Sequence, residues 1–300
     1  MRRFTLLQIV LVSSVFTQAV SAAETTNAAA APHSEGLRVV IIDGVNKDPE
    51  EIRSKDKNVM RLARYFRDTI GVPAQSLFVL TQADSFVGER TGASDAATIK
   101  SVLTALAKQP SKGTTIIYYT GQANLVGDQL RFNIPGPDIT HEEFGALIKA
   151  FGEAPLCVVL DCPGAGHAVK ALAGPNRIVV CAARSDQPTS TRFSDYFVPA
   201  LTDTKADING DGHISLLEAF QLTVQQIDAA FRDRSLMKSE TALLDDNGDG
   251  VPSQRPWVSG EEEKDGEWAS RLYTDTWKMA ATIQQKSEAE AETSATAGKP

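Results

Sequence analysis

From residue 37 onward, short apolar runs alternate with stretches in which apolar residues recur at helical spacing. The runs are apolar throughout, and they lie at residues 39–42, 77–80, 114–119, 156–160 and 178–181. Strands that are buried on both faces need such runs, and helices between the strands supply the cover. The pattern therefore predicts an α/β fold in which a mostly parallel sheet lies between two helical layers, a three-layer sandwich.

The apolar faces of three helices lie between these strands. They consist of Val59, Leu62, Ala63, Phe66 and Ile70 in the first, Ile99, Val102, Leu103 and Leu106 in the second, and Phe144, Leu147, Ile148 and Phe151 in the third. Thr140 and Glu143 have the spacing of a capping box, which places the start of the third helix there. Alternation around Gly127, within residues 126–134, favours a small hairpin.

After residue 181 the pattern changes to a helix, an acidic loop and a second helix. The first helix is indicated by Phe193, Phe197 and Leu201, and the second by Leu217, Phe220, Val224, Ile227 and Phe231. Ser215 and Glu218 again have capping-box spacing, so the second helix is expected to begin at the end of the loop.

The loop between these helices, residues 207–218, has the residue types and spacing of an EF-hand calcium loop. The expected ligands are Asp207, Asn209, Asp211, the carbonyl of His213, Ser215 or a water that it holds, and both carboxylate oxygens of Glu218. Gly212 permits the sharp turn between them. A turn that binds nothing is the alternative, because Asp, Asn and Gly favour turns for backbone reasons alone. Glu218 at the twelfth position and the flanking apolar helix faces favour calcium.

A second acidic loop repeats the first half of this pattern. Its expected ligands are Asp245, Asn247, Asp249 and the carbonyl of Val251. Its twelfth position is Pro256, so a closing carboxylate must come from elsewhere in the chain or be missing. We expect a weaker or differently completed calcium site, followed by an amphipathic C-terminal helix at residues 257–285 and a disordered tail at residues 286–300.

The N-terminus has the order of a secretory signal peptide. Arg2 and Arg3 precede an apolar run at residues 4–20 and a group of small residues that ends at Ala23. A retained membrane anchor is the rival interpretation, but polar residues interrupt the run. We expect a signal peptide at residues 1–22 and a flexible lead-in at residues 23–36. The protein is then exported, periplasmic or extracellular, with no membrane contact after cleavage.

The net charge and the number of cysteines indicate which partners and which disulfide bonds can be excluded. The formal net charge of the 300-residue chain is −8, which argues against nucleic acid as a partner. Three cysteines are too few for a disulfide framework. Two of them could pair, but Cys157 and Cys181 each lie inside an apolar run, and we interpret them as small core residues.

Two stretches resemble the caspase and legumain-like cysteine peptidases of clan CD. In that family the third strand ends in a turn containing Gly-His-Gly, whereas residues 121–123 are Gly-Gln-Ala and place Gln122 at the histidine position. The fourth strand of the family ends in Asp-x-Cys followed by Gly. Residues 161–166 are Asp-Cys-Pro-Gly-Ala-Gly, which puts Pro163 at the nucleophile position and Cys162 one residue early.

The resemblance extends from about residue 37 to residue 250, and it is closest to bacterial, exported members of the family. The stretches that carry it are residues 131–138, 193–201, 215–220 and 243–250. It implies a caspase-like α/β domain at residues 37–200 and an EF-hand calcium-binding region at residues 201–256. It also implies a cleft for a peptide or protein ligand.

The same resemblance implies that no catalytic residue is present, because a cysteine peptidase needs an imidazole base and a thiol nucleophile. Gln122 and Pro163 supply neither. We therefore expect an exported calcium-binding pseudopeptidase or binding module. The alternative is an active cysteine endopeptidase that uses Cys162 with an unassigned base, for which His167 is the nearest imidazole. A shift of one register step turns a strand-end side chain to the other face, which disfavours this alternative.

Overall fold

The computed structural model describes residues 36–82, 90–109, 111–258 and 265–280. All of these residues belong to one of two compact units, Ala31–Pro300; the other unit, Met1–Ala30, lies outside them. The expected signal peptide, the lead-in up to residue 35 and the expected tail at residues 286–300 also lie outside the described residues.

A seven-stranded sheet forms the centre of the described unit, with the strands in the order β10-β9-β8-β4-β1-β2-β3. The strands are β1 (Arg38–Asp43), β2 (Leu77–Thr81), β3 (Gly92–Ala93), β4 (Thr115–Thr120), β8 (Leu156–Asp161), β9 (Arg177–Cys181) and β10 (Leu243–Asp245). All neighbours pair in parallel except β9 and β10. The expected mixed α/β fold with a mostly parallel sheet is confirmed.

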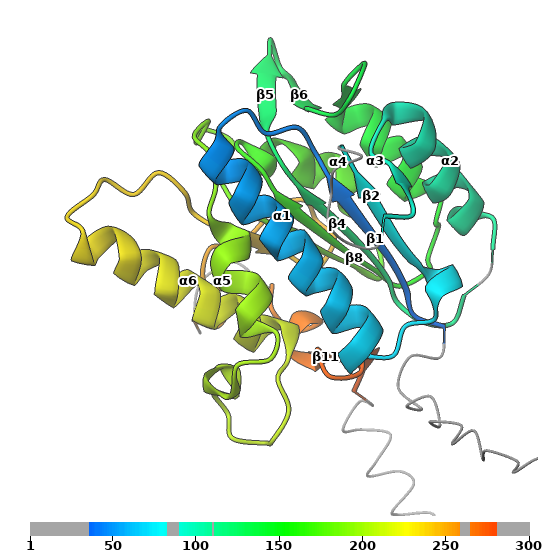
Figure 1. Cartoon of the computed structure of the whole chain (residues 1–300). Coiled ribbons are helices and arrows are strands. Elements are labelled where there is room, and N and C mark those ends of the chain that lie inside the picture. Colours follow the sequence, from blue (N-terminus) through cyan, green and yellow to red (C-terminus); the bar gives the residue numbers. More distant parts are fainter. Residues whose placement is uncertain (1–35, 83–89, 110, 259–264, 281–300) are drawn as a thin grey trace, which may run out of the picture. The chain divides into compact units, whose positions relative to one another are not determined.

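Helices cover both faces of this sheet (Figure 1). One layer contains α1 (Pro49–Arg64), α5 (Phe193–Ala200) and α6 (Leu216–Asp233), and the other contains α2 (Ala96–Ala107), α3 (His141–Lys149) and α4 (Val169–Leu172). Two separate apolar clusters fill the spaces between sheet and helices. Successive strand residues alternate between them, as Val39 and Val40 do, so uniform apolar runs are needed.

Local signals set the ends of several helices. Asp48 is the N-cap of α1, where its carboxylate accepts the N–H groups of Glu50 and Glu51, and Pro49 takes the first helical position. Both expected capping boxes are present, with Thr140 and Glu143 at the start of α3 and Ser215 with Glu218 at the start of α6. The predicted starts of these two helices are confirmed.

A hairpin is present as expected, but it spans residues 123–132 rather than 126–134, and it belongs to a separate three-stranded antiparallel sheet. Its strands are β5 (Ala123–Val126), β6 (Gln129–Phe132) and β7 (Ile139–Thr140). β5 begins immediately after Gln122, so the hairpin continues from the carboxyl end of β4.

The amphipathic helix expected at residues 257–285 is not formed where this range is described. Residues 265–280 contain a 3-10 turn (Ala269–Arg271) and the short antiparallel pair β11 (Leu272–Tyr273) and β12 (Lys278–Met279). The N–H of Thr274 donates to the carbonyl of Ile214 at 2.8 Å. A helix would withdraw such backbone groups from the acidic loop, so tertiary pairing overrides the helical spacing of the apolar residues.

Trp277 anchors this segment against the rest of the fold. Its buried ring lies 5.4 Å from that of Phe66, and its indole N–H donates to the Tyr65 hydroxyl at 2.9 Å. Within the described residues, no helix is both long and apolar enough to cross a membrane. Cys157 and Cys181 are buried free thiols, as expected for small core residues, and Cys162 is a buried free thiol as well.

Candidate functional site

The first acidic loop is curled around the carboxylate of Asp207. One oxygen accepts the N–H groups of Gly210 (2.8 Å) and Asp211 (3.1 Å), and the other accepts that of Gly212 (3.1 Å). Gly210 and Gly212 have φ angles of 73° and 86°, a region that favours glycine. Asn209 and Asp211 each accept the N–H two residues further on. These hydrogen bonds and the two glycines set the backbone path of the loop.

Glu218 closes the first loop from the opening turn of α6. One carboxylate oxygen accepts the N–H groups of Ile208 (3.2 Å) and Asn209 (3.1 Å), and the other accepts the N–H (2.9 Å) and hydroxyl (2.8 Å) of Ser215. The side chain is buried. Glu218 thus joins the second, third and ninth positions of the loop, and its place is fixed by the capping box.

The second acidic loop repeats most of these contacts at the same positions. Asp245 accepts the N–H groups of Gly248 (3.1 Å) and Gly250 (2.7 Å). Asn247 accepts from Asp249 at 2.8 Å, and Asp249 accepts from Val251 at 2.7 Å. The backbone path of the first half is therefore the same in both loops.

Asp265 closes the second loop in the way that Glu218 closes the first. One carboxylate oxygen accepts the N–H groups of Asp246 (3.0 Å) and Asn247 (3.4 Å). The other accepts the N–H (3.1 Å) and hydroxyl (2.6 Å) of Ser253. These are again the second, third and ninth positions. The carboxylate that Pro256 could not supply comes from elsewhere in the chain, and no spacing in the sequence marks Asp265 for this role.

Burial and repulsion between like charges raise the pKa values of acidic side chains in the second loop. Burial, with the Asp265 carboxylate as the next cause, raises the pKa of Asp245 to about 6. Burial also raises the pKa of Asp246. The described residues contain no group of three or more His, Cys, Asp or Glu side chains already converged on one point. The loop donors are instead mixed carboxylate, amide, hydroxyl and carbonyl oxygens, which is the donor set that suits calcium.

A cleft lies at the carboxyl ends of β1 and β4. β1 has β2 on one side and β4 on the other, which makes this the point where the strand order reverses and where ligands bind in open α/β sheets. Two hollows of about 410 and 500 Å³ meet here at Asp48 and Glu51. The first is also lined by Glu50, Ser54, Lys55, Ser190, Thr191, Arg192 and Asp195, and the second by Val45, Lys47, Gln122, Ala123, Asn124 and Asn133.

The three positions expected from the peptidase resemblance do not meet in this cleft. Gln122 lines the second hollow, and its amide donates to Glu51 and Ser190 at 2.7 Å each. Cys162 has no solvent exposure and packs in the apolar cluster on the α2, α3 and α4 face. Burial raises the pKa of its thiol well above the ordinary range. Pro163 is buried beside it, and neither residue lines either of the two hollows of the cleft.

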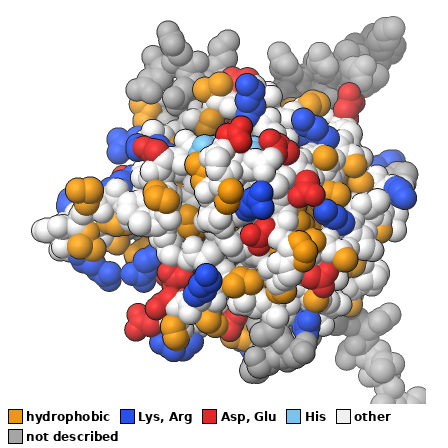
Figure 2. Space-filling model, turned by 90° about the horizontal axis from the view of Figure 1, so that it is seen from above, with side chains coloured by type: hydrophobic (Ala, Val, Ile, Leu, Met, Phe, Trp, Pro, Cys, Tyr) orange, Lys and Arg blue, Asp and Glu red, His pale blue; other side chains and the backbone are white. Residues whose placement is uncertain are grey.

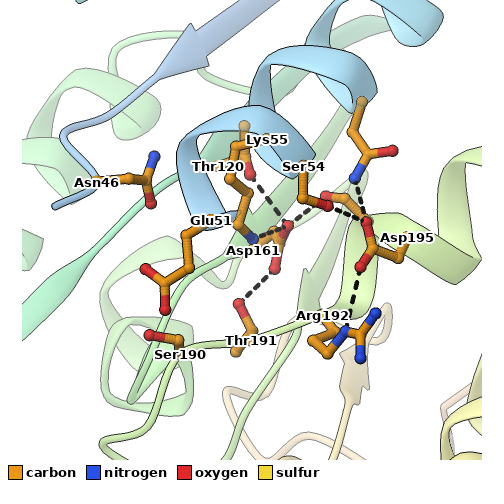
Figure 3. A network of polar contacts seen from close by, with 12 residues as sticks. Asn46, Glu51, Ser54, Lys55, Thr120, Asp161, Ser190, Thr191, Arg192 and Asp195 are labelled. Atoms are coloured by element: carbon orange, nitrogen blue, oxygen red, sulfur yellow. Dashed lines mark hydrogen bonds and ion pairs between the residues drawn. The ribbon is translucent and has the colours of Figure 1, made fainter. Parts of the chain in front are cut away.

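The floor of the first hollow is a buried polar network around Asp161 (Figure 3). Lys55 from α1 lies 2.6 Å from one carboxylate oxygen, which also accepts hydrogen bonds from Thr120 and Ser194. Thr191 donates to the other oxygen at 2.5 Å. A charge-paired carboxylate with these donors joins α1, β4, β8 and the start of α5. The sequence does contain a signal for Lys55, because it lies at helical spacing from Val59 on the apolar face.

Asp43, at the end of β1, contrasts with Asp161. It is buried, and neither of its carboxylate oxygens has a hydrogen-bond partner of good geometry, although the backbone of Gln82 is near enough to offset a small part of the effect of burial on its pKa. Burial, followed by the nearby Asp56 carboxylate, raises its pKa to about 7. The cleft region therefore contains one satisfied and one unsatisfied buried carboxyl group.

No family model matches the sequence, and no curated protein matches it. A solved structure of caspase-1 from Spodoptera frugiperda is similar to the fold, with a TM-score of 0.47 and 8% sequence identity. The similarity covers 71% of this chain and 87% of that one.

Proposed function

We propose that the protein is an exported calcium-binding protein with a caspase-like fold and no peptidase activity. The observation that carries calcium binding is the shared hydrogen-bond pattern of the two acidic loops, each closed by one buried carboxylate at its second, third and ninth positions. Two unrelated turns would not be expected to share this arrangement. The caspase-like fold is proposed from the sequence resemblance, and export from the signal-peptide pattern at residues 1–22.

Each loop supplies oxygen ligands of the kind that calcium prefers. In the first loop we assign Asp207, Asn209, Asp211, the carbonyl of His213, Ser215 and Glu218. In the second we assign Asp245, Asn247, Asp249 and the carbonyl of Val251, and we add Asp265 as the closing carboxylate. Extracellular calcium modules bind at about 10⁻⁴–10⁻³ M, so we expect structural sites rather than sensors.

Calcium at these loops would fasten residues 265–280 to the fold. Asp265 begins this segment and closes the second loop. Further along, Thr274 pairs with Ile214 of the first loop, and Asp275 lies 2.7 Å from the His213 imidazole. Both proposed sites therefore act on one segment, and a cation would relieve repulsion between its carboxylate and those of the loops.

The lack of peptidase activity is proposed from the chemistry of the cleft. The Gln122 amide has no useful basicity near neutral pH, so it cannot accept a thiol proton. The Cys162 thiol is buried, and its raised pKa disfavours the thiolate that attacks a peptide bond. Alkylation of Cys162 in the folded chain, with loss of a measurable peptide-cleaving activity, would support the alternative of an active endopeptidase.

The position of the cleft favours a second, compatible function, the binding of a peptide or protein segment. Both hollows lie where the strand order reverses, and Ala123 at the start of the edge strand β5 lines one of them. An extended segment could pair with β5 while a side chain enters the hollow. The Glu51→Ala variant, compared with Glu142→Ala on α3, tests this in a screen of immobilised peptides.

Calcium titration of the full chain tests the main proposal. After treatment with a chelator, calorimetry is expected to show two bound calcium ions per chain, and calcium is expected to raise the melting temperature. Glu218→Gln and Asp265→Asn should each remove one site. Glu267→Gln, an exposed acid two residues from Asp265, is the matched control and should retain both.

The outcomes of this titration are distinct. Two sites that are lost one at a time support the assignment of both closing carboxylates. Loss of one site in Glu218→Gln, with no change in Asp265→Asn, would reject the second loop alone. A melting temperature that does not respond to calcium in the unmodified chain would reject calcium binding altogether.

A further inference from the structure

A small groove lies between α5, the last turns of α6 and the chain that follows α6. Its walls are the apolar side chains Tyr196, Ile227, Ala230, Phe231 and Leu236, together with Arg192, Arg234 and Glu240. Neither acidic loop lies in this groove, and Arg192 is the residue that it shares with the cleft. The groove and the loop beside it have no role in the function proposed above.

The end of α6 fixes the path of this loop. Leu236 N–H donates to the carbonyl of Phe231 at 2.9 Å, and Ser235 N–H donates to that of Arg232 at 3.0 Å. Ser235 has a φ of 52°, in the left-handed region. These are the two bonds and the backbone turn of a Schellman motif, and Phe231 and Leu236 both line the groove. The chain after α6 therefore leaves the helix in a defined direction.

Two adjacent apolar side chains are presented to solvent by this turn. Leu236 is 57% exposed and Met237 is 92% exposed. Met237 is the most exposed large hydrophobic side chain among the described residues. The groove itself has a volume of only about 60 Å³, so an occupant of the groove would not account for the exposure of Met237.

Basic side chains surround the exposed pair. The cations are Arg192, Arg232, Arg234, Lys238 and Arg255, and the acids that pair with some of them are Asp195, Asp228 and Asp233. Arg234 has no ion pair within the described chain. With Glu240, which also lines the groove, the five cations face four acids, and residues 232–238 themselves carry three cations and one acid in a chain whose net charge is −8. In Figure 2 the left-hand edge, where Figure 1 has the end of α6, carries hydrophobic side chains beside lysines and arginines.

We propose that residues 232–238 form a docking site for an anionic lipid surface. Leu236 and Met237 enter the interface between headgroups and acyl chains, while Arg232 and Arg234 contact phosphate groups. Exposed apolar side chains flanked by cations are what such a surface binds, and cations on an otherwise acidic protein select anionic lipid. The site is peripheral and needs no membrane-spanning segment, and it would replace the expectation from the sequence that the exported chain has no membrane contact after cleavage.

A label at position 237 tests the proposal. Cys157, Cys162 and Cys181 are fully buried, so Met237→Cys provides a selectively accessible thiol for a polarity-sensitive fluorophore. Val126→Cys is the control, because Leu125 and Val126 are also an adjacent exposed apolar pair, but Asp128 flanks them. The full chain is mixed, in a chelator, with vesicles of phosphatidylcholine alone or with an equal part of phosphatidylglycerol. Because the apolar run at residues 4–20 could hold the chain on a vesicle, the environment of the label is the readout.

The expected result is a blue-shifted emission at position 237, and not at position 126, only with phosphatidylglycerol vesicles. Added salt should reverse it. Arg234→Gln should weaken the response about fivefold, whereas Lys149→Gln, an equal change of charge on α3, should not. Equal shifts at positions 237 and 126, or equal effects of the two charge variants, would overturn the proposal. A label at position 237 that responds to no vesicle would also overturn the proposal, and it would favour a protein partner for the groove.

Discussion

The first acidic loop is closed by a residue of its own, whereas the second is closed from a distance. The N–H of Ile208 and its acceptor Glu218 are 10 residues apart, and the N–H of Asp246 and its acceptor Asp265 are 19 apart. The closing carboxylate accepts hydrogen bonds from the same three loop positions in both loops. The comparison shows that such a loop needs a carboxylate in the right place, and that the chain can supply it either from the next helix or from a separate segment.

A consequence of distant closure is that the second loop depends on the C-terminal segment for its shape. Asp246 reinforces this dependence, because its carboxylate accepts the N–H groups of Gly266 and Ala269 at 2.8 Å each. In the first loop, the equivalent second position is Ile208, which is exposed and makes no such contact. The second loop is therefore an integral part of the packing, and the first is a projecting turn with one buried anchor.

The largest expected effect comes from removing the closing carboxylates in the absence of calcium. Asp265→Ala leaves three N–H groups and the Ser253 hydroxyl without their acceptor, at a cost of about 3 kcal/mol or more. We expect Asp265→Ala to destabilise the chain at least as much as Glu218→Ala does. Urea unfolding in chelator measures both free energies. A near-neutral Asp265→Ala variant would break the proposed equivalence of the two loops.

A pH series tests the buried carboxyl group of Asp43, at the end of β1 near the cleft. Its folded pKa of about 7 lies above the unfolded value, so the native state binds the proton more tightly. The contribution of Asp43 to stability therefore falls as pH rises from about 4 to about 7 and is level above that. Asp43→Asn should be up to about 4 kcal/mol more stable than the unmodified chain at pH 8, and nearly equal to it near pH 4.

Chemical unfolding at these two pH values measures the difference. Asp195→Asn is the opposite control, because hydrogen bonds with Ser54, Asn58 and Arg192 outweigh burial and lower the pKa of Asp195. That variant should lose stability at pH 8. A gain for Asp43→Asn that is the same at both pH values would show that its charge is not the cause.

Glycine substitutions test which loop is packed, and Gly212→Ala gives the smallest of these effects. Gly212 and Gly248 both have positive φ angles, of 86° and 80°. An added Cβ at Gly212 meets nothing within 4 Å, whereas at Gly248 it lies 2.6 Å from the carbonyl oxygen of Gly174. We expect Gly212→Ala to cost about 1 kcal/mol from backbone strain, and Gly248→Ala to cost about 1–3 kcal/mol more. Equal costs in urea unfolding would contradict the contrast between projecting and packed loops.

The sequence predicted the elements whose signals are local. Uniform apolar runs identified five strands of the sheet, and capping-box spacing gave the starts of α3 and α6. The first loop was recognisable because Glu218 follows in the next helix. A buried role for Lys55 was also predictable, because a charged residue on the apolar face of a helix needs a partner of opposite charge.

The remaining features depend on contacts between segments far apart in sequence. Asp265 has no spacing that connects it with Asp245, because the chain leaves and returns between them. The apolar residues of the C-terminal segment have helical spacing, but pairing with Ile214 and Ser215 gives them a strand-like path. Periodicity reports which residues are buried, and it does not report which backbone groups find partners elsewhere.

The second loop also covers an edge of the central sheet. β10 is a short edge strand, and on its outer side Leu244 exchanges both backbone hydrogen bonds with Ser253, at 2.9 and 2.8 Å. Ser253 is in turn held by Asp265. An uncovered strand edge is a template for pairing with another chain. The carboxylate of Asp265 therefore protects the protein from edge-to-edge aggregation, so its loss is expected to lower solubility as well as stability.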